Sequence, residues 1–355
     1  MDVILDSTAL IADFQLTTAA MSGLLGGSKE RRINLFVPEL VLLEVVHKWR
    51  ERVSDVVAKA ESTVQSAKRV GLNSLAVTIP SIDDEVAAYE GHLRQKLKDA
   101  FVEICAIPDV SHKTLVEKAI QRRAPFADRG AGYRDALIWE SVKEVLQSGD
   151  GSVVFVTANK SDFGSSPNSI PQDLLDELTQ EDIAHSQLMI VATTADAAET
   201  TLEHPQRITE RFEEKLETDK VFSERLFGEI VEGADLGIEN VGRIRSSDLN
   251  VKFLQVHEVY DISHFNAFRS WLISHGRIGI EFEAEADMDV DLEYEESSYP
   301  SYYFDPNRDP WPGSTQYATK TVTGRLGGQL EFDEATERFS ALSTSLWDLS
   351  TPDLP

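Results

Sequence analysis

Short apolar runs alternate with helical patterns through the first half of this chain, and this alternation limits the possible folds more than any other feature. Strands that alternate with helices form a parallel sheet wound by right-handed crossovers. We therefore predict an α/β domain over residues 1–196. The runs with strand character are Val3–Leu5, Asn34–Val37, Leu75–Ile79, Val153–Val156 and Leu188–Ala192. The helical patterns are Thr8–Leu25, Pro38–Val70, Asp83–Ile104, Ser111–Arg122 and Asp135–Leu146.

The character of the sequence changes after about Asp196, which predicts a second, smaller domain. The chain has 355 residues and a net charge of −27. Residues 1–165 carry a net charge of −3, and the remaining residues carry −24. Such an asymmetry is typical of two units with different tasks. We interpret residues 197–355 as an acidic α+β domain that repels bare nucleic acid at low salt.

The second domain contains one long stretch of strict alternation, Ile278–Tyr294. One face of this stretch is apolar, and the other carries Gly279 followed by acidic residues alone. This pattern predicts an antiparallel strand with one wet side, and therefore an antiparallel sheet. The remaining expectations are charged helices over Ala197–Glu232, a helix at Ser263–Ser274, a loop at Tyr299–Gly313 and return strands at Tyr317–Leu326 and Gln329–Phe332.

Acidic residues occupy positions from which they can reach one edge of the first sheet. Asp6 comes one residue after the first strand, and Asp162 follows the fourth strand by a few residues. Ligand sites of parallel sheets lie at the carboxyl ends of the strands. Glu44 lies about two turns into its helix, and Asp135 begins another helix. Taken singly, each acid could be a helix cap, a turn residue or a solvent-facing side chain.

Four separated segments contain these acids: LDSTAL at 5–10, VPELVLLEVVHK at 37–48, GYRDALIW at 132–139 and VTANKSDFG at 156–164. In this order they resemble the PIN-domain nucleases, in their larger bacterial form, over roughly residues 1–195. The resemblance implies a PIN-like sheet and a nuclease site formed by Asp6, Glu44, Asp135 and Asp162. It also implies that these carboxylates hold Mg²⁺ or Mn²⁺, which take oxygen ligands and activate water for phosphodiester hydrolysis.

Three further residues of the matching segments are expected to orient the acids through hydrogen bonds: Ser7, Thr157 and Asn159. For each of them, a local role in a turn is the alternative.

Basic residues near the acids are expected to contact the phosphates of a substrate. The residues expected to bind substrate are Arg134, Lys48 and Arg129. For Lys48, a salt bridge on a solvated helix face is the alternative. Tyr133 could stack a base, although a packing role fits a tyrosine at this position better.

Several other classes of site lack the residues that they need. The eight histidines form no HxxxH or HxH pair, and Cys105 is the only cysteine, so a zinc site is not expected. The chain has no GxxxxGK[ST] or GxSxG motif. It also lacks an apolar stretch long enough to cross a bilayer and an export signal, so we expect a cytoplasmic protein without a membrane partner.

The acidic face from Glu281 to Glu293 leaves two interpretations open. It could be a solvated sheet face, although like charges at this spacing repel each other. It could instead be a docking surface for a basic protein partner or for the basic rim of the first domain.

The resemblance implies a metal-dependent endonuclease that acts on RNA, with a toxin or defence role. One alternative is a structure-specific DNA nuclease, although a second acidic cluster is missing from the sequence. The other is a catalytically silent PIN-fold protein with a regulatory or binding role. All four acids are present, which favours an enzyme.

Overall fold

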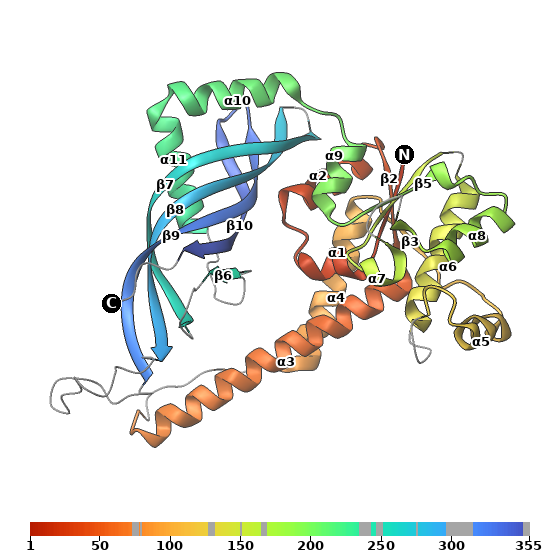
Figure 1. The fold of residues 1–355 in the computed structure, drawn as a ribbon, viewed down its shortest axis with the longest axis horizontal. Helices are drawn as coiled ribbons and strands as arrows, with labels where there is room; N and C mark the ends of the chain where they lie inside the picture. Colours follow the sequence, from red (N-terminus) through yellow and green to blue (C-terminus); the bar gives the residue numbers. More distant parts are fainter. Residues whose placement is uncertain are drawn as a thin grey trace, which may run out of the picture. The chain divides into compact units, whose positions relative to one another are not determined.

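The computed structural model divides the chain into two compact units, Met1–Glu203 and His204–Pro355 (Figure 1). The residues that it describes are 1–72, 78, 80–126, 132–149, 151–164, 169–233, 243–245, 251–274, 276–295 and 315–350. Within these ranges, no helix is both long enough and apolar enough to cross a membrane.

The first unit is built on a five-stranded sheet in the order β3-β2-β1-β4-β5, and every neighbouring pair is parallel. The strands are β1 (Asp2–Leu5), β2 (Asn34–Pro38), β3 (Glu103–Cys105), β4 (Val153–Val156) and β5 (Leu188–Val191). All residues of the central strands β1 and β4 are buried, as expected of a parallel sheet covered on both faces. The predicted wound parallel sheet is confirmed.

Helices connect these strands and cover the sheet (Figure 1). They are α1 (Ser7–Ala12), α2 (Ala19–Lys29), α3 (Glu39–Arg69), α4 (Ile82–Asp99), α5 (His112–Gln121), α6 (Tyr133–Ser148), α7 (Lys160–Phe163), α8 (Gln172–Gln180) and α9 (Thr194–Thr201), with a 3₁₀ turn, η3, at His185–Gln187.

One of the five strands does not lie where the sequence predicted it. The run Leu75–Ile79 falls outside the described residues apart from Thr78, which has no regular structure. Strand β3 comes instead from the end of the predicted helix Asp83–Ile104. Helix α4 stops because Phe101 adopts a left-handed conformation (φ +57°) and Val102 N–H donates to Leu97 O. A glycine or asparagine would normally mark such a stop, so the sequence carried no signal for it.

Three aromatic rings anchor helix α3 just beyond Glu44. Trp49 of α3 stacks on Tyr89 of α4 with ring centroids 4.4 Å apart. Phe14 meets Trp49 edge to face at 5.3 Å, and its carbonyl oxygen accepts a hydrogen bond from Tyr89 Oη at 3.0 Å. Each such ring pair contributes about 0.5–1.5 kcal/mol beyond the burial of its area. The turn of α3 that follows Glu44 is therefore held in place.

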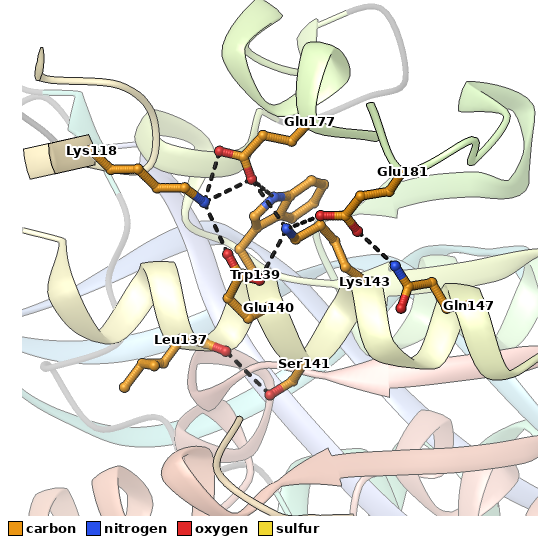
Figure 2. Close-up of polar contacts among 9 residues, drawn as sticks. All are labelled: Lys118, Leu137, Trp139, Glu140, Ser141, Lys143, Gln147, Glu177 and Glu181. Atoms are coloured by element: carbon orange, nitrogen blue, oxygen red, sulfur yellow. Dashed lines mark hydrogen bonds and ion pairs between the residues drawn. The ribbon is translucent and has the colours of Figure 1, made fainter. Parts of the chain in front are cut away.

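A nearly buried ionic cluster ties α6 to α5 and α8 (Figure 2). Lys143 of α6 is paired with Glu181 at 2.6 Å and with Glu140 at 3.0 Å, and its side chain is 6% exposed. Lys118 of α5 is paired with Glu140 at 2.9 Å and with Glu177 of α8 at 2.8 Å. Two ammonium groups thus lie among three carboxylates, and the cluster fixes α6 from the side of α5 and α8.

The cluster changes the pKa values of its members. Burial alone would raise the pKa of Glu140, but hydrogen bonds from Lys118 and Lys143 bring it below its ordinary value. Burial alone would lower the pKa of Lys143, but Glu181 and Glu140 bring it above its ordinary value. A lowered carboxyl pKa contributes stability above the unfolded-state pKa, and this contribution is lost as pH falls through the folded-state value. The cluster therefore stabilises the first unit at neutral pH.

The second unit is a sheet in the order β6-β10-β9-β8-β7 with two helices. Its elements are α10 (Gln206–Thr218), α11 (Lys220–Gly233), β6 (Arg243–Arg245), β7 (Val251–Ser274), β8 (Arg277–Glu295), β9 (Thr315–Asp333) and β10 (Arg338–Ser350). The pair β6–β10 is parallel, and the other pairs are antiparallel. Phe212 of α10 and Leu226 of α11 share one core with Phe282 of β8, so the helices cover the apolar face of the sheet. The predicted α+β class with an antiparallel sheet is confirmed.

The predicted helix at Ser263–Ser274 is wrong, because these residues belong to β7. The pairing of β7 with β8 shifts register repeatedly, for example between Ser263 and Asn266 and between Ala267 and Arg269. Each bulge adds a residue to the strand, so apolar side chains recur at three- and four-residue spacing and imitate a helix. The two predicted return strands are parts of one strand, β9, and the predicted loop Tyr299–Gly313 lies outside the described residues.

Side chains of the neighbouring strands partly compensate the acidic face of β8. Arg269 of β7 donates to Glu281 at 3.2 Å. His264 of β7 lies 3.0 Å from Glu285, and Arg325 of β9 lies 3.8 Å from the same carboxylate. Strand β8 itself carries no basic residue between Glu281 and Glu293. The face is therefore less acidic than its own sequence suggests.

The ionic cluster generates a prediction about stability. Replacing Lys143→Met removes the ammonium group, keeps most of the volume, leaves Glu181 without its ammonium partner and leaves Glu140 with Lys118 alone. Removing one partner of a buried pair costs about 3–5 kcal/mol. Urea unfolding of the whole chain, followed by circular dichroism, should show this loss. The matched control is Lys113→Met. The Lys113 side chain is 83% exposed, so this substitution should change the free energy of unfolding by less than about 1 kcal/mol. Equal effects of the two substitutions would contradict a structural role for the cluster.

Candidate functional site

The four acids lie on elements that meet at the carboxyl edge of the first sheet. Asp6 directly follows β1, and Asp162 lies in α7, which follows β4, the strand next to β1. Glu44 lies in the second turn of α3, which follows β2 on the other side of β1. Asp135 lies in the first turn of α6, whose far end leads into β4. Parallel pairing thus sets these residues at the same edge.

Asp6 is buried and held by donors on three sides. Its Oδ1 accepts hydrogen bonds from Ser7 N–H at 2.6 Å and from Ser7 Oγ at 3.3 Å. Its Oδ2 accepts from Thr157 Oγ1 at 2.7 Å and from Thr8 Oγ1 at 3.1 Å. Burial raises the pKa of Asp6, the nearby charge of Glu44 adds to the rise, and these hydrogen bonds oppose it. Asp6 is 3% exposed, and its carboxylate has a fixed orientation.

Asn159 joins the other two aspartates. Its side-chain amide donates to Asp135 Oδ1 at 3.1 Å and to Asp162 Oδ2 at 2.8 Å. Its backbone N–H donates to Thr157 Oγ1 at 3.1 Å, the same oxygen that donates its proton to Asp6. One short segment after β4 therefore contacts three of the four acids.

The electrostatics of Asp135 show that the four acids form one charged group. Burial raises the pKa of Asp135 to about 6, and the negative charges of Asp162, Asp6 and Glu44 contribute to the rise. Carboxylates raise one another's pKa in this way when they share a site.

Glu44 forms an ion pair with Arg134, a residue that was expected to bind the phosphates of a substrate. Arg134 Nη1 donates to Glu44 Oε1 at 2.5 Å. The Arg134 side chain is 62% exposed and that of Glu44 is 15% exposed. The guanidinium group therefore lies at the rim of the site and reaches solvent, while Glu44 is largely enclosed.

Of the other two residues expected to contact phosphates, the structure describes only Lys48. Lys48 forms an exposed salt bridge with Glu51 at 2.8 Å, the alternative that the sequence left open. Exposed pairs of this kind contribute little energy, so Lys48 can exchange partners. Arg129 lies outside the described residues.

The donor set has the chemistry of a site for a hard divalent cation. Its four carboxylates offer oxygen ligands, and their mutual repulsion would be relieved by a cation. Among the residues that the structure describes, no group of three or more His, Cys, Asp or Glu side chains is arranged to hold a metal ion. The carboxylates are instead occupied by protein donors, chiefly Asn159, Thr157 and Arg134.

Sequence reasoning missed Thr8 and misjudged Tyr133. The hydroxyl of Thr8 accepts a hydrogen bond from Ala158 N–H at 2.9 Å, so Thr8 links the segment after β1 to the segment after β4. Its place in the polar run after the first strand was an available signal. Tyr133 was expected to pack, but it is 48% exposed.

The raised pKa of Asp135 generates a prediction about pH and stability. Between its unfolded value near 3.8 and its folded value of about 6, the folded protein binds more protons. Stability should therefore fall as pH rises through this window and stay low above it. In EDTA, Asp135→Asn should stabilise the protein at pH 8 by about 1–2 kcal/mol, the shift being roughly halved for solvent screening of this partly exposed group. It should give little or no gain at pH 4. Urea unfolding at both pH values measures this, and an equal effect at both would contradict the coupling.

Comparison with known proteins identifies one family. Residues 3–163 match the family model described as a PIN domain. No curated protein and no solved structure matches the chain. The matched range contains all four acids and ends directly after Asp162.

Proposed function

Residues 3–163 form a PIN domain, the fold of a superfamily of nucleases, and we propose that the chain is a divalent-metal-dependent endonuclease that cleaves RNA. The observation that carries the proposal is the coupled group of four acids at the carboxyl edge of the sheet. Burial raises the pKa of Asp135 to about 6, and the negative charges of Asp162, Asp6 and Glu44 contribute to the rise. An arrangement that costs stability in this way is typical of a functional site.

In this proposal the four carboxylates hold one or two Mg²⁺ or Mn²⁺ ions. Such ions lower the pKa of bound water and neutralise charge on the phosphate oxygens. Asp6 is the central ligand, because it is the most deeply buried of the four and the most firmly held. Asn159 keeps Asp135 and Asp162 side by side, and Thr157 orients Asp6. Outer hydrogen-bond partners of this kind fix the direction of ligand oxygens.

Arg134 has a second role in the proposal. Its exposed guanidinium group pairs with Oε1 of Glu44 and would balance part of the negative charge of the carboxylates that would hold an ion. A guanidinium group also binds phosphate oxygens in a fixed geometry. Arg134 therefore positions the scissile phosphate at the rim, and Lys48 and Arg129 contact the flanking phosphates.

Two alternative functions can be tested by the same cleavage assay. A structure-specific DNA nuclease would use the same acids on a different substrate. A silent PIN-fold protein would bind nucleic acid without cleaving it, and the presence of all four acids argues against it. The preference for RNA comes from the family, whose members often act on RNA.

The nuclease proposal predicts metal-dependent cleavage that requires Asp6. Purified protein should cleave labelled RNA in Mn²⁺ or Mg²⁺, and EDTA should stop it. Asp6→Asn should reduce cleavage below detection because it removes the central ligand. Asp55→Asn, an exposed acid on α3, is the matched control and should keep full activity.

The measurement is a panel of single- and double-stranded RNA and DNA, with and without Mn²⁺. Cleavage of DNA alone would favour the first alternative. Full activity of Asp6→Asn, or activity that survives EDTA, would contradict the metal-nuclease proposal.

For the second unit, we propose that the acidic face of β8 binds a basic protein partner. Its acids alternate along one side of the strand. Arg269, His264 and Arg325 lie beside Glu281 and Glu285, and the hydroxyl groups of Thr321 and Thr323 donate to Asp289 and Asp287. Attraction of this kind acts through partly exposed charges, so it should weaken as salt shortens the Debye length, which is about 8 Å at physiological ionic strength.

Removing four charges from this face tests the proposal. The first variant replaces these acids by serine: Glu283, Glu285, Asp287 and Asp289. It should weaken binding of an oligolysine peptide at low salt, because serine keeps the alternation and removes the attraction. The control variant replaces four exposed acids of α10 by glutamine: Glu210, Glu213, Glu214 and Glu217. Fluorescence anisotropy measures the affinity of both variants for the peptide. Equal losses of affinity would indicate an effect of net charge, and unchanged binding by the first variant would indicate that the face is only a solvated surface.

A further inference from the structure

An exposed aromatic pair lies near the acids, at the amino-terminal ends of two helices. Tyr133 is the first residue of α6, and His112 is the first residue of α5. Their ring centroids are 6.5 Å apart, and the ring planes are inclined by 59°. Tyr133 is 48% exposed and His112 is exposed. Packing in the core therefore does not account for these rings.

Chain connectivity sets this pair at the edge of the sheet where the acids lie. Tyr133 precedes Arg134 by one residue and Asp135 by two. Helix α6 runs from this end toward the start of β4, so its first turn lies at the carboxyl edge. Helix α5 follows β3, whose carboxyl end is at the same edge because β3 is parallel to β2. A substrate that reaches Asp135 therefore passes close to Tyr133.

We propose that the ring of Tyr133, supported by the inclined ring of His112, forms a stacking platform for a base of a single-stranded nucleic acid whose cleaved phosphate lies at the four acids. This inference rests on the proposed nuclease function and names the form of its substrate. Bases in a single strand can turn outward and stack on aromatic rings, whereas bases in a duplex are covered by their neighbours. Stacking tolerates any sequence, because every base offers a ring face.

A cationic residue follows each of the two rings in the chain, and such residues suit the phosphates next to a stacked base. Arg134 follows Tyr133, and its side chain is 62% exposed. Lys113 follows His112, and its side chain is 83% exposed. Lys113 lies 3.7 Å from Glu117 in an exposed pair that contributes little energy, so it can contact a phosphate instead. The platform thus combines a stacking surface with two phosphate contacts, which is how sequence-independent single-strand binding works.

The test measures affinity in the full chain with Asp6→Asn, so that no cleavage interferes. The ligands are a fluorescein-labelled oligouridine and an abasic oligonucleotide of the same length. Adding Tyr133→Ala should weaken oligouridine binding about 5- to 150-fold, the effect of losing one stacked base. Binding of the abasic strand should not change. Tyr133→Phe keeps the ring and should keep the affinity.

Two further variants make the result decisive. Phe268→Ala removes a ring of the second unit that is 41% exposed, and it should leave oligouridine binding unchanged. His112→Ala, on an exposed position of another helix, should also weaken binding of oligouridine more than of the abasic strand, and it serves if Tyr133→Ala fails to fold.

Equal affinity of the Tyr133→Ala and parent chains for oligouridine would overturn the platform, even if the wild type cleaves RNA. The platform would also be overturned if duplex RNA bound as tightly as the single strand and lost as much affinity in Tyr133→Ala. Base-dependent binding that requires Tyr133, in a protein that cleaves nothing, would uphold the platform and remove the nuclease proposal. The two failures are therefore distinguishable.

Discussion

The first unit must hold four mutually repelling carboxylates at one edge of its sheet, and the surrounding contacts offset this repulsion. Strands β2, β1 and β4 lie side by side, so the residues that follow them meet. Burying acids and bringing them together costs free energy, and the pKa of Asp135, raised by burial and by the charges of the other three acids, reflects that cost. The donors around the site offset part of it: Thr157 for Asp6, Asn159 for Asp135 and Asp162, and Arg134 for Glu44. The polar residues that follow β4 are therefore as much a part of the site as the acids.

The helices that carry the acids are fixed by interactions outside the site. Trp49 and Tyr89 hold α3 beyond Glu44, and the ionic cluster around Lys143 holds α6 two turns beyond Asp135. Acids that repel one another would separate if their helices could move. Rigid support from a distance keeps the charges together and makes the geometry of the site a property of the whole unit.

The sequence predicted the parts of the structure that depend on local pattern. Apolar runs located β1, β2, β4 and β5, and strict alternation located β8. It failed where backbone conformation departs from the pattern: Phe101 ends α4 without a glycine, and the bulges of β7 imitate helical spacing. The hydrogen-bond and ion-pair partners of the acids were even harder to predict from the sequence. Nothing in the sequence indicates that Arg134 would pair with Glu44, 90 residues away, or that Tyr133 would be exposed.

Binding of Mn²⁺ to the purified chain tests the central claim most directly, because it needs no knowledge of the substrate. Isothermal titration calorimetry of the wild type and of Asp6→Asn, with Asp55→Asn as the control, measures it. If the four acids form a cation site, wild type and control should bind Mn²⁺ equally and Asp6→Asn should bind far more weakly. Equal Mn²⁺ binding by all three proteins, or no binding by the wild type, would contradict the account.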